Sequence, residues 1–119
     1  MKYMLMMFGS AGEMMQTQSE DWVREMIRFM VKFDDDLRES GELVFAEGLA
    51  DGSTAKVVSL DGGGAPVVTD GPYAEAKESL IGFWVLDVAS EERAVEIAAQ
   101  VAHYSGKVEM RQVGSPPEV

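Results

Sequence analysis

The order of apolar and polar residues predicts a strand, a loop and a long helix in the first third of the chain. Lys2–Phe8 is apolar at almost every position, which predicts a strand buried on both faces. Gly9–Gln18 is expected to be a loop. Apolar residues then recur up to about Glu39 with the spacing of one helix face, at Trp22, Val23, Met26, Ile27, Phe29, Met30, Phe33 and Leu37.

The ends of this helix carry the residues that helix termini favour. Either Thr17, with Glu20 completing a capping box, or Ser19 is expected to cap its start. Gly41 is expected to end it in the left-handed conformation. Asp34 is the exception to the pattern, because this carboxylate falls inside the apolar arc.

The rest of the chain predicts strands and one further helix. The expected strands are Leu43–Leu49, Lys56–Leu60, Ala65–Thr69, Ile81–Val88 and Val108–Val113. The second and third of these form a hairpin around a turn at Asp61–Gly64. Ser90 caps the helix, whose buried stripe is expected to contain Ala94, Val95, Ile97, Ala98, Val101 and Ala102. Residues 1–113 then make a single domain, and 114–119 a C-terminal tail.

This order of elements predicts an α+β fold, a ferredoxin-like α/β sandwich with a β-hairpin insertion. Helices in such a fold cover one sheet face, yet Tyr3–Phe8 and Phe83–Val88 are apolar on both faces. A second copy of the chain is the simplest cover for the other face. We therefore expect a homodimer that forms through the sheets.

Composition restricts the classes of partner and chemistry. The chain has 119 residues, which suits one domain, and its 21 acidic and 10 basic residues give a formal net charge of −11. Such a charge repels phosphate backbones and anionic headgroups, so nucleic acid and membranes are not expected partners. The sequence contains no cysteine, which removes disulfides, thiolate nucleophiles and thiolate metal sites and suits a cytoplasmic location.

The segment Val68–Glu78, with Asp70-Gly71-Pro72-Tyr73 at its centre, resembles the signature of the YCII-related family in its DGPF branch. The branch has Phe where this chain has Tyr73. The opening residues, Glu47-Gly48-Leu49 and Val108–Arg111 also fit, so the resemblance spans nearly the whole chain.

The resemblance implies a dimeric α/β sandwich of ferredoxin-like type, in a branch that largely lacks assigned functions and whose members occur near or fused to alternative sigma factors. Proteins of the wider family are proposed to use a His–Asp pair as acid and base, with the histidine on the first helix. This chain has Met30 near that place, so the pair is not carried over. His103 is its single histidine. It falls in the last turn of the second helix, where a positive charge interacts favourably with the helix C-terminus, so a capping role is expected.

The charged segment Asp70–Glu78 is the first candidate site. A partly buried carboxylate of Asp70 or Glu75 beside Lys77 would form a general acid–base pair, in a cleft walled by methionines, Phe83 or Trp84. The alternative is a hairpin turn, in which Asp70 binds backbone amides and the other charges face solvent.

The second candidate is Asp34, with Glu47 on a neighbouring strand as its companion. Paired carboxylates can share a proton or bind a metal, whereas a carboxylate at the edge of the arc can simply reach solvent. The residues expected to bind a ligand are Asp34, Glu47, Tyr73, Glu78 and Trp84. The nine methionines are interpreted as core packing around a malleable pocket, with no metal or cofactor expected.

Two functions remain open from the sequence. The first is a dimeric module that binds a small molecule in a cleft near Asp70–Glu78, with a regulatory role. The second is a cofactor-free small-molecule enzyme, an acid–base isomerase or lyase that uses Asp70 or Glu75 with Lys77.

Overall fold

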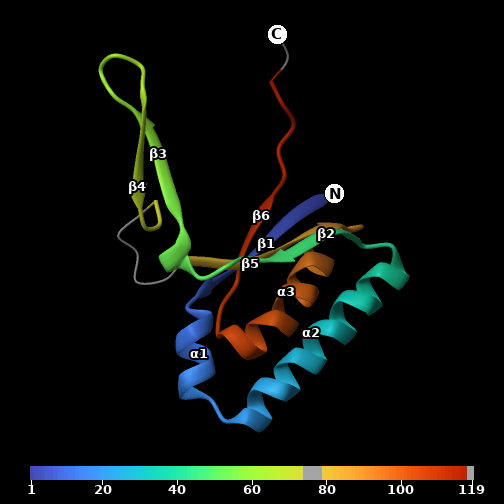
Figure 1. The fold of residues 1–119 in the computed structure, drawn as a ribbon. Coiled ribbons are helices and arrows are strands. Elements are labelled where there is room, and N and C mark those ends of the chain that lie inside the picture. Colours follow the sequence, from blue (N-terminus) through green and yellow to red (C-terminus); the bar gives the residue numbers. More distant parts are fainter. Residues whose placement is uncertain (74–78, 118–119) are drawn as a thin grey trace.

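The computed structural model describes residues 1–73 and 79–117, and Figure 1 shows its fold. Within these residues the chain forms a mixed α+β structure with an antiparallel sheet. Its elements in chain order are β1 (Lys2–Gly9), α1 (Ala11–Thr17), α2 (Glu20–Ser40), β2 (Leu43–Gly48), the short 3₁₀ helix η1 (Gly52–Thr54), β3 (Lys56–Leu60), β4 (Pro66–Asp70), β5 (Ser79–Asp87), α3 (Glu91–Ser105) and β6 (Glu109–Gln112).

The main sheet has the strand order β2-β5-β1-β6. β1 and β5 lie at its centre and pair antiparallel, with Leu5 opposite Trp84. β2 pairs with the free side of β5, and β6 with the free side of β1. The two segments that are apolar on both faces therefore contribute the two central strands.

Helices α2 and α3 lie on the same side of the sheet, as Figure 1 shows. Because side chains alternate along a strand, every second residue of β1 and β5 points toward these helices. The core between the layers consists of Tyr3, Leu5, Phe33, Leu37, Trp84, Leu86, Val88, Ala94, Ile97 and Val101.

Helix α2 begins and ends at capping residues. The Ser19 hydroxyl accepts a hydrogen bond from the Trp22 backbone N–H at 3.1 Å, so Ser19 is the cap and Thr17 is not. Gly41 ends the helix with a φ of 79°, a conformation that glycine adopts without the steric cost of a Cβ.

The loop expected at Gly9–Gln18 is wrong over most of its length. Helix α1 occupies Ala11–Thr17, and the Ser10 hydroxyl caps it by accepting from the Glu13 N–H at 3.2 Å. A helix this short shows no periodicity long enough to detect in the sequence. The polar residues of the segment are the cap Ser10 and the exposed Glu13, Gln16 and Thr17.

On both long helices, fewer residues are buried than the apolar pattern of the sequence predicts. On α3, Val95 was expected to be buried but is 51% exposed, and on α2 Ile27 is 50% exposed. Each helix turns one side toward the sheet, so apolar residues at the edge of the arc stay in solvent. Among the described residues, no helix combines the length and the apolar character needed to cross a bilayer.

The β3–β4 hairpin forms a separate two-stranded sheet that projects from the body (Figure 1). At its tip the Asp61 carboxylate accepts hydrogen bonds from the N–H groups of Gly63 and Ala65, at 2.8 and 2.9 Å. This confirms the hairpin predicted around the glycine-rich turn. Its exposed apolar side chains are Val58, Leu60, Val67 and Val68.

The sheet face that points away from α2 and α3 is also apolar. Met4 and Met6 of β1 and Phe83 and Val85 of β5 are half-buried there, and Phe45 of β2 is 50% exposed. The rings of Phe45 and Phe83 pack against each other with centroids 5.7 Å apart. In Figure 1 the hairpin and the segment after β6 rise on this side of the sheet. We call the surface formed by Met4, Met6, Phe45, Phe83 and Val85 the open face.

Candidate functional site

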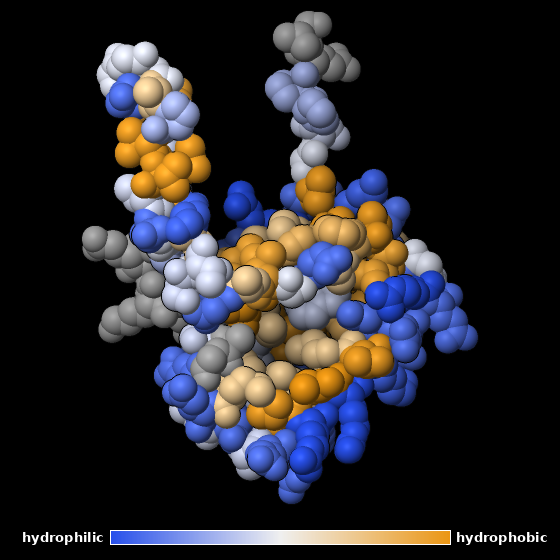
Figure 2. All heavy atoms as spheres, viewed as in Figure 1, coloured by the Kyte–Doolittle hydropathy of each residue, from blue (hydrophilic) through white to orange (hydrophobic). Residues whose placement is uncertain are grey.

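A pocket of about 480 Å³ lies between α1, α2 and the adjoining parts of β2 and β5. Figure 2 shows a hollow ringed by hydrophobic side chains between α2 and the sheet. Its lining consists of Met7, Met14, Met15, Met26, Met30, Asp34, Arg38, Ala46, Glu47, Gly48, Ile81, Gly82, Phe83 and Trp84. This volume lies in the range of pockets that hold small organic molecules.

Methionine dominates the apolar part of this lining. Five of the nine methionines of the chain contribute, from β1, α1 and α2, namely Met7, Met14, Met15, Met26 and Met30. An unbranched thioether side chain has three rotatable bonds and a polarizable sulfur, so it adapts to irregular shapes. The pocket therefore has one wall that can reshape around a bound molecule.

Helix α2 supplies its part of the lining as a single row. Met26, Met30, Asp34 and Arg38 follow one another at intervals of four residues, so they lie above one another on one helix face. The sequence contained this signal, but the same interval also fits an ordinary buried face. Only the tertiary arrangement, in which α1, α2 and the sheet border one pocket, distinguishes the two cases, and α1 was not predicted.

Asp34 is held in the pocket by the indole of Trp84. The Trp84 Nε1–H donates to Asp34 Oδ1 at 2.8 Å, and Trp84 itself is 6% exposed. Phe33 packs edge-on against the indole, with ring centroids 5.7 Å apart. The aspartate inside the apolar arc thus has a structural reason: its carboxylate accepts the hydrogen bond of a buried tryptophan.

Glu47 and Arg38 lie at the margin of the same pocket. Glu47 pairs with Phe83 across β2 and β5, one position beyond the pair of Ala46 and Trp84. Strand alternation turns the Glu47 side chain toward the open face, so its main chain is what borders the pocket. Arg38 Nη1 donates to Asp35 Oδ1 at 3.1 Å and is largely exposed.

Asp34 and Glu47 consequently share a pocket without forming a carboxylate pair. The ion pairs between described residues include neither of them. The described residues also contain no group of three or more histidine, aspartate or glutamate side chains placed to hold a metal ion. What the site presents is a single oriented carboxylate above an apolar wall.

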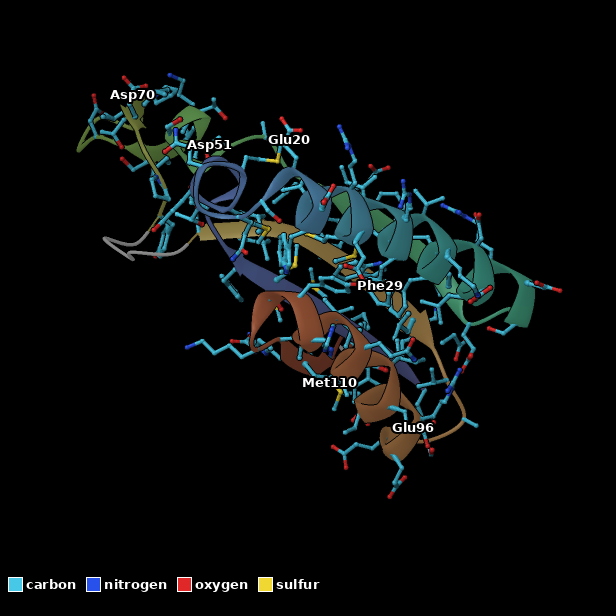
Figure 3. The ribbon with its side chains drawn as sticks, turned by 90° about the horizontal axis from the view of Figure 1, so that it is seen from below. Glu20, Phe29, Asp51, Asp70, Glu96 and Met110 are labelled. Carbon is cyan, nitrogen blue, oxygen red and sulfur yellow. The ribbon has the colours of Figure 1, made fainter. Side chains whose placement is uncertain are left out.

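The charged segment is only partly described. Asp70 ends β4, is exposed, and forms an ion pair with Lys56 on the neighbouring strand. Figure 3 places it on the hairpin, apart from α2 and α3. Gly71 follows with a φ of 107° and donates its N–H to the Ala55 carbonyl at 2.8 Å. These contacts are those of a hairpin end, while Glu75, Lys77 and Glu78 lie outside the described residues.

Tyr73 lies beside a second hollow, which shares no lining residue with the first. This hollow of about 490 Å³ is bordered by Phe8, Leu49, Ala50, Asp51, Gly52, Thr54, Ala55, Pro72, Tyr73, Ser79 and Leu80. The Tyr73 side chain is 94% exposed. Of the residues expected to bind a ligand, the structure therefore places Asp34 and Trp84 in contact, leaves Glu47 at the border of the same pocket with its side chain toward the open face, and puts Tyr73 beside a different hollow.

Comparison with known proteins identifies the family. The chain is 37% identical over 51 residues to an uncharacterised protein of Rhizobium meliloti (strain 1021), a match that covers 43% of this chain and 41% of that protein. The model of the YCII-related domain matches residues 1–115, which is nearly the whole chain. Both the extent of this match and the mixed α+β architecture lead to one conclusion: the chain belongs to the YCII-related domain family.

Proposed function

We propose that this protein is a small-molecule-binding domain whose ligand occupies the pocket between α1, α2 and the sheet. One observation supports this most strongly: a partly buried carboxylate, oriented by a buried indole, faces a pocket of about 480 Å³ with a largely apolar lining. Apolar walls with a few placed polar groups are the usual composition of a ligand site.

A neutral molecule tests this function without assuming the charge of the ligand. The probe is 4-phenyl-1-butanol, titrated into protein carrying ¹³C-labelled methionine methyl groups and followed by NMR. We expect saturable shifts of the five methionines in the lining and unchanged signals from Met1, Met4, Met6 and Met110. Shifts confined to Met4 and Met6 would place binding on the open face and contradict the proposal, as would the absence of any shift.

A pair of alanine variants controls for nonspecific binding. Ala46→Leu fills part of the lining and is expected to weaken probe binding. Ala98→Leu makes the same change at another alanine that packs partly buried against the core, outside the pocket. Equal weakening by both variants, at equal melting temperature, would count against the pocket as the site.

We further propose that the fold is ferredoxin-like and that the protein is a homodimer formed through the open face. The order β2-β5-β1-β6, with the hairpin inserted between β2 and β5, supports a split βαβ arrangement. The apolar side chains of the open face support a dimer, because monomers seldom leave such a surface in water. The Asp70-Gly71-Pro72-Tyr73 segment supports membership of the DGPF branch.

A further inference from the structure

The Asp34 carboxylate has bonding capacity left after it binds the indole. Its Oδ1 accepts the Trp84 N–H, and none of the hydrogen bonds between described residues uses Oδ2. An ionised carboxylate only accepts hydrogen bonds, so a ligand that meets Oδ2 must bring a donor. The indole holds the carboxylate plane in place, which reduces the entropy lost when that donor binds.

The charge around the pocket favours a cationic donor. Asp34 forms no ion pair with a described residue, and the guanidinium of Arg38, four residues on, binds Asp35 instead. The formal net charge of −11 adds a field that attracts cations to the molecule as a whole. A hydrogen bond from an ammonium group to a carboxylate is also stronger than one from a neutral hydroxyl.

The rest of the lining suits the apolar part of such a ligand. Met26 and Met30 precede Asp34 in the row along α2, and Met14 and Met15 face them from α1. Methionine thioethers make favourable contacts with aromatic rings and adapt to aliphatic chains. Trp84 adds an aromatic ring to the lining, next to the carboxylate.

We propose that the pocket binds an organic amine. The ammonium group of the amine donates to Asp34 Oδ2, and its apolar or aromatic body packs against the five methionines of the lining. This inference rests on the proposed binding function and names the class of ligand. Arg38 offers a carboxylate ligand a weaker site, because its guanidinium is largely exposed at the margin of the pocket and already pairs with Asp35.

The test compares three molecules of nearly equal size by isothermal titration calorimetry. They are 4-phenylbutylamine, 4-phenyl-1-butanol and 4-phenylbutyrate, all measured at neutral pH. We expect the amine to bind about tenfold more tightly than the alcohol, and the carboxylate to bind most weakly. Equal affinities for amine and alcohol would overturn the amine inference and leave the binding function in place. Failure of all three to bind would reject both.

Two variants separate the effect of the Asp34 carboxylate from that of the overall negative charge of the protein. Asp34→Asn removes the charge but keeps an oxygen that can accept the indole N–H, so the preference for the amine should disappear while the alcohol still binds. Asp36→Asn removes one charge from the same helix at an exposed position paired with Lys32, outside the pocket. It should leave the preference unchanged. Equal loss in both variants, or tightest binding of the carboxylate, would contradict the proposal.

Discussion

At the residue scale, the contact between Asp34 and Trp84 links stability to the candidate site. The buried indole N–H needs an acceptor, and Asp34 supplies it at 2.8 Å. Asp34→Leu would leave this donor unpaired, and we expect a loss of about 1–3 kcal/mol in the free energy of unfolding. Asp34→Asn retains an acceptor and should cost clearly less. Urea denaturation of both variants measures the difference, and equal losses would show that the hydrogen bond does not matter.

A second residue contact, between Glu42 and Arg93, predicts a pH dependence. Arg93 Nε and Nη2 donate to the two carboxylate oxygens of Glu42, each at 2.9 Å, and these hydrogen bonds hold the pKa of Glu42 below its usual range. The same bonds raise the pKa of Arg93. Because the pKa of Glu42 is lower in the folded state, its contribution is complete above the ordinary glutamate pKa of about 4.3 and is lost as the pH falls.

Glu42→Gln should therefore lower the stability at pH 7 by about 1 kcal/mol, a value reduced by the partial exposure of Arg93. At pH 3 the difference from the unmodified protein should shrink toward zero. Glu96→Gln is the matched control, because Glu96 also pairs with Arg93 but is mostly exposed. Thermal melts across this pH range measure the effect. A difference that grows as the pH falls would contradict the assignment.

At the scale of elements, the packing of η1 against the start of β5 sets the base of the hairpin. A Cβ added to Gly52 would lie 2.2 Å from Ser79 Oγ and 3.0 Å from Ser79 Cβ. We expect Gly52→Ala to destabilise the fold by about 1–3 kcal/mol, because the added atom overfills the contact. Ser79→Gly in the same chain should restore part of this loss.

Gly62→Ala provides the control for this prediction. Gly62 lies in the hairpin turn, and a Cβ there would meet nothing within 4 Å. Chemical denaturation should therefore show little change for Gly62→Ala. If Gly52→Ala were equally harmless, η1 and β5 could not be packed as closely as described.

The same scale shows which elements could be predicted from sequence. The helix over Glu20–Ser40 and the β3–β4 hairpin carry local signals, namely a serine cap, a left-handed glycine and a glycine-rich turn. α1 also has a serine cap, Ser10, but its seven residues are too few to show a helical period. The exposure of Val95 likewise depends on how closely α3 meets the sheet, which its sequence does not encode locally.

The candidate site was also predictable only where its residues carry a local sequence signal. Asp34 stood out because a carboxylate interrupted an apolar pattern, and this residue lines the pocket. The sequence suggested a malleable pocket among the methionines but not which of them line it, because the five lining methionines come from β1, α1 and α2 and meet only through tertiary packing. A methionine on an apolar face looks the same whether it fills a core or lines a cavity.

At the scale of the whole molecule, the open face carries the prediction of a dimer. We expect sedimentation velocity to give twice the mass of one chain. Phe45→Lys places a charge on the open face at a side chain that is already half exposed, so it should dissociate the dimer without unfolding the monomer. Ile27→Lys changes an equally exposed side chain of α2 and should leave the dimer intact. A monomeric unmodified protein would refute the dimer.

The binding pocket is the central claim, and a crystal structure with bound probe tests it most directly. Crystals grown with saturating 4-phenylbutylamine, and separately with 4-phenyl-1-butanol, should show the phenyl ring of each probe against the methionines between α1 and α2. The amine nitrogen should lie within hydrogen-bond distance of Asp34 Oδ2. Probe density beside Tyr73 or on the open face, with this pocket unfilled, would contradict the account.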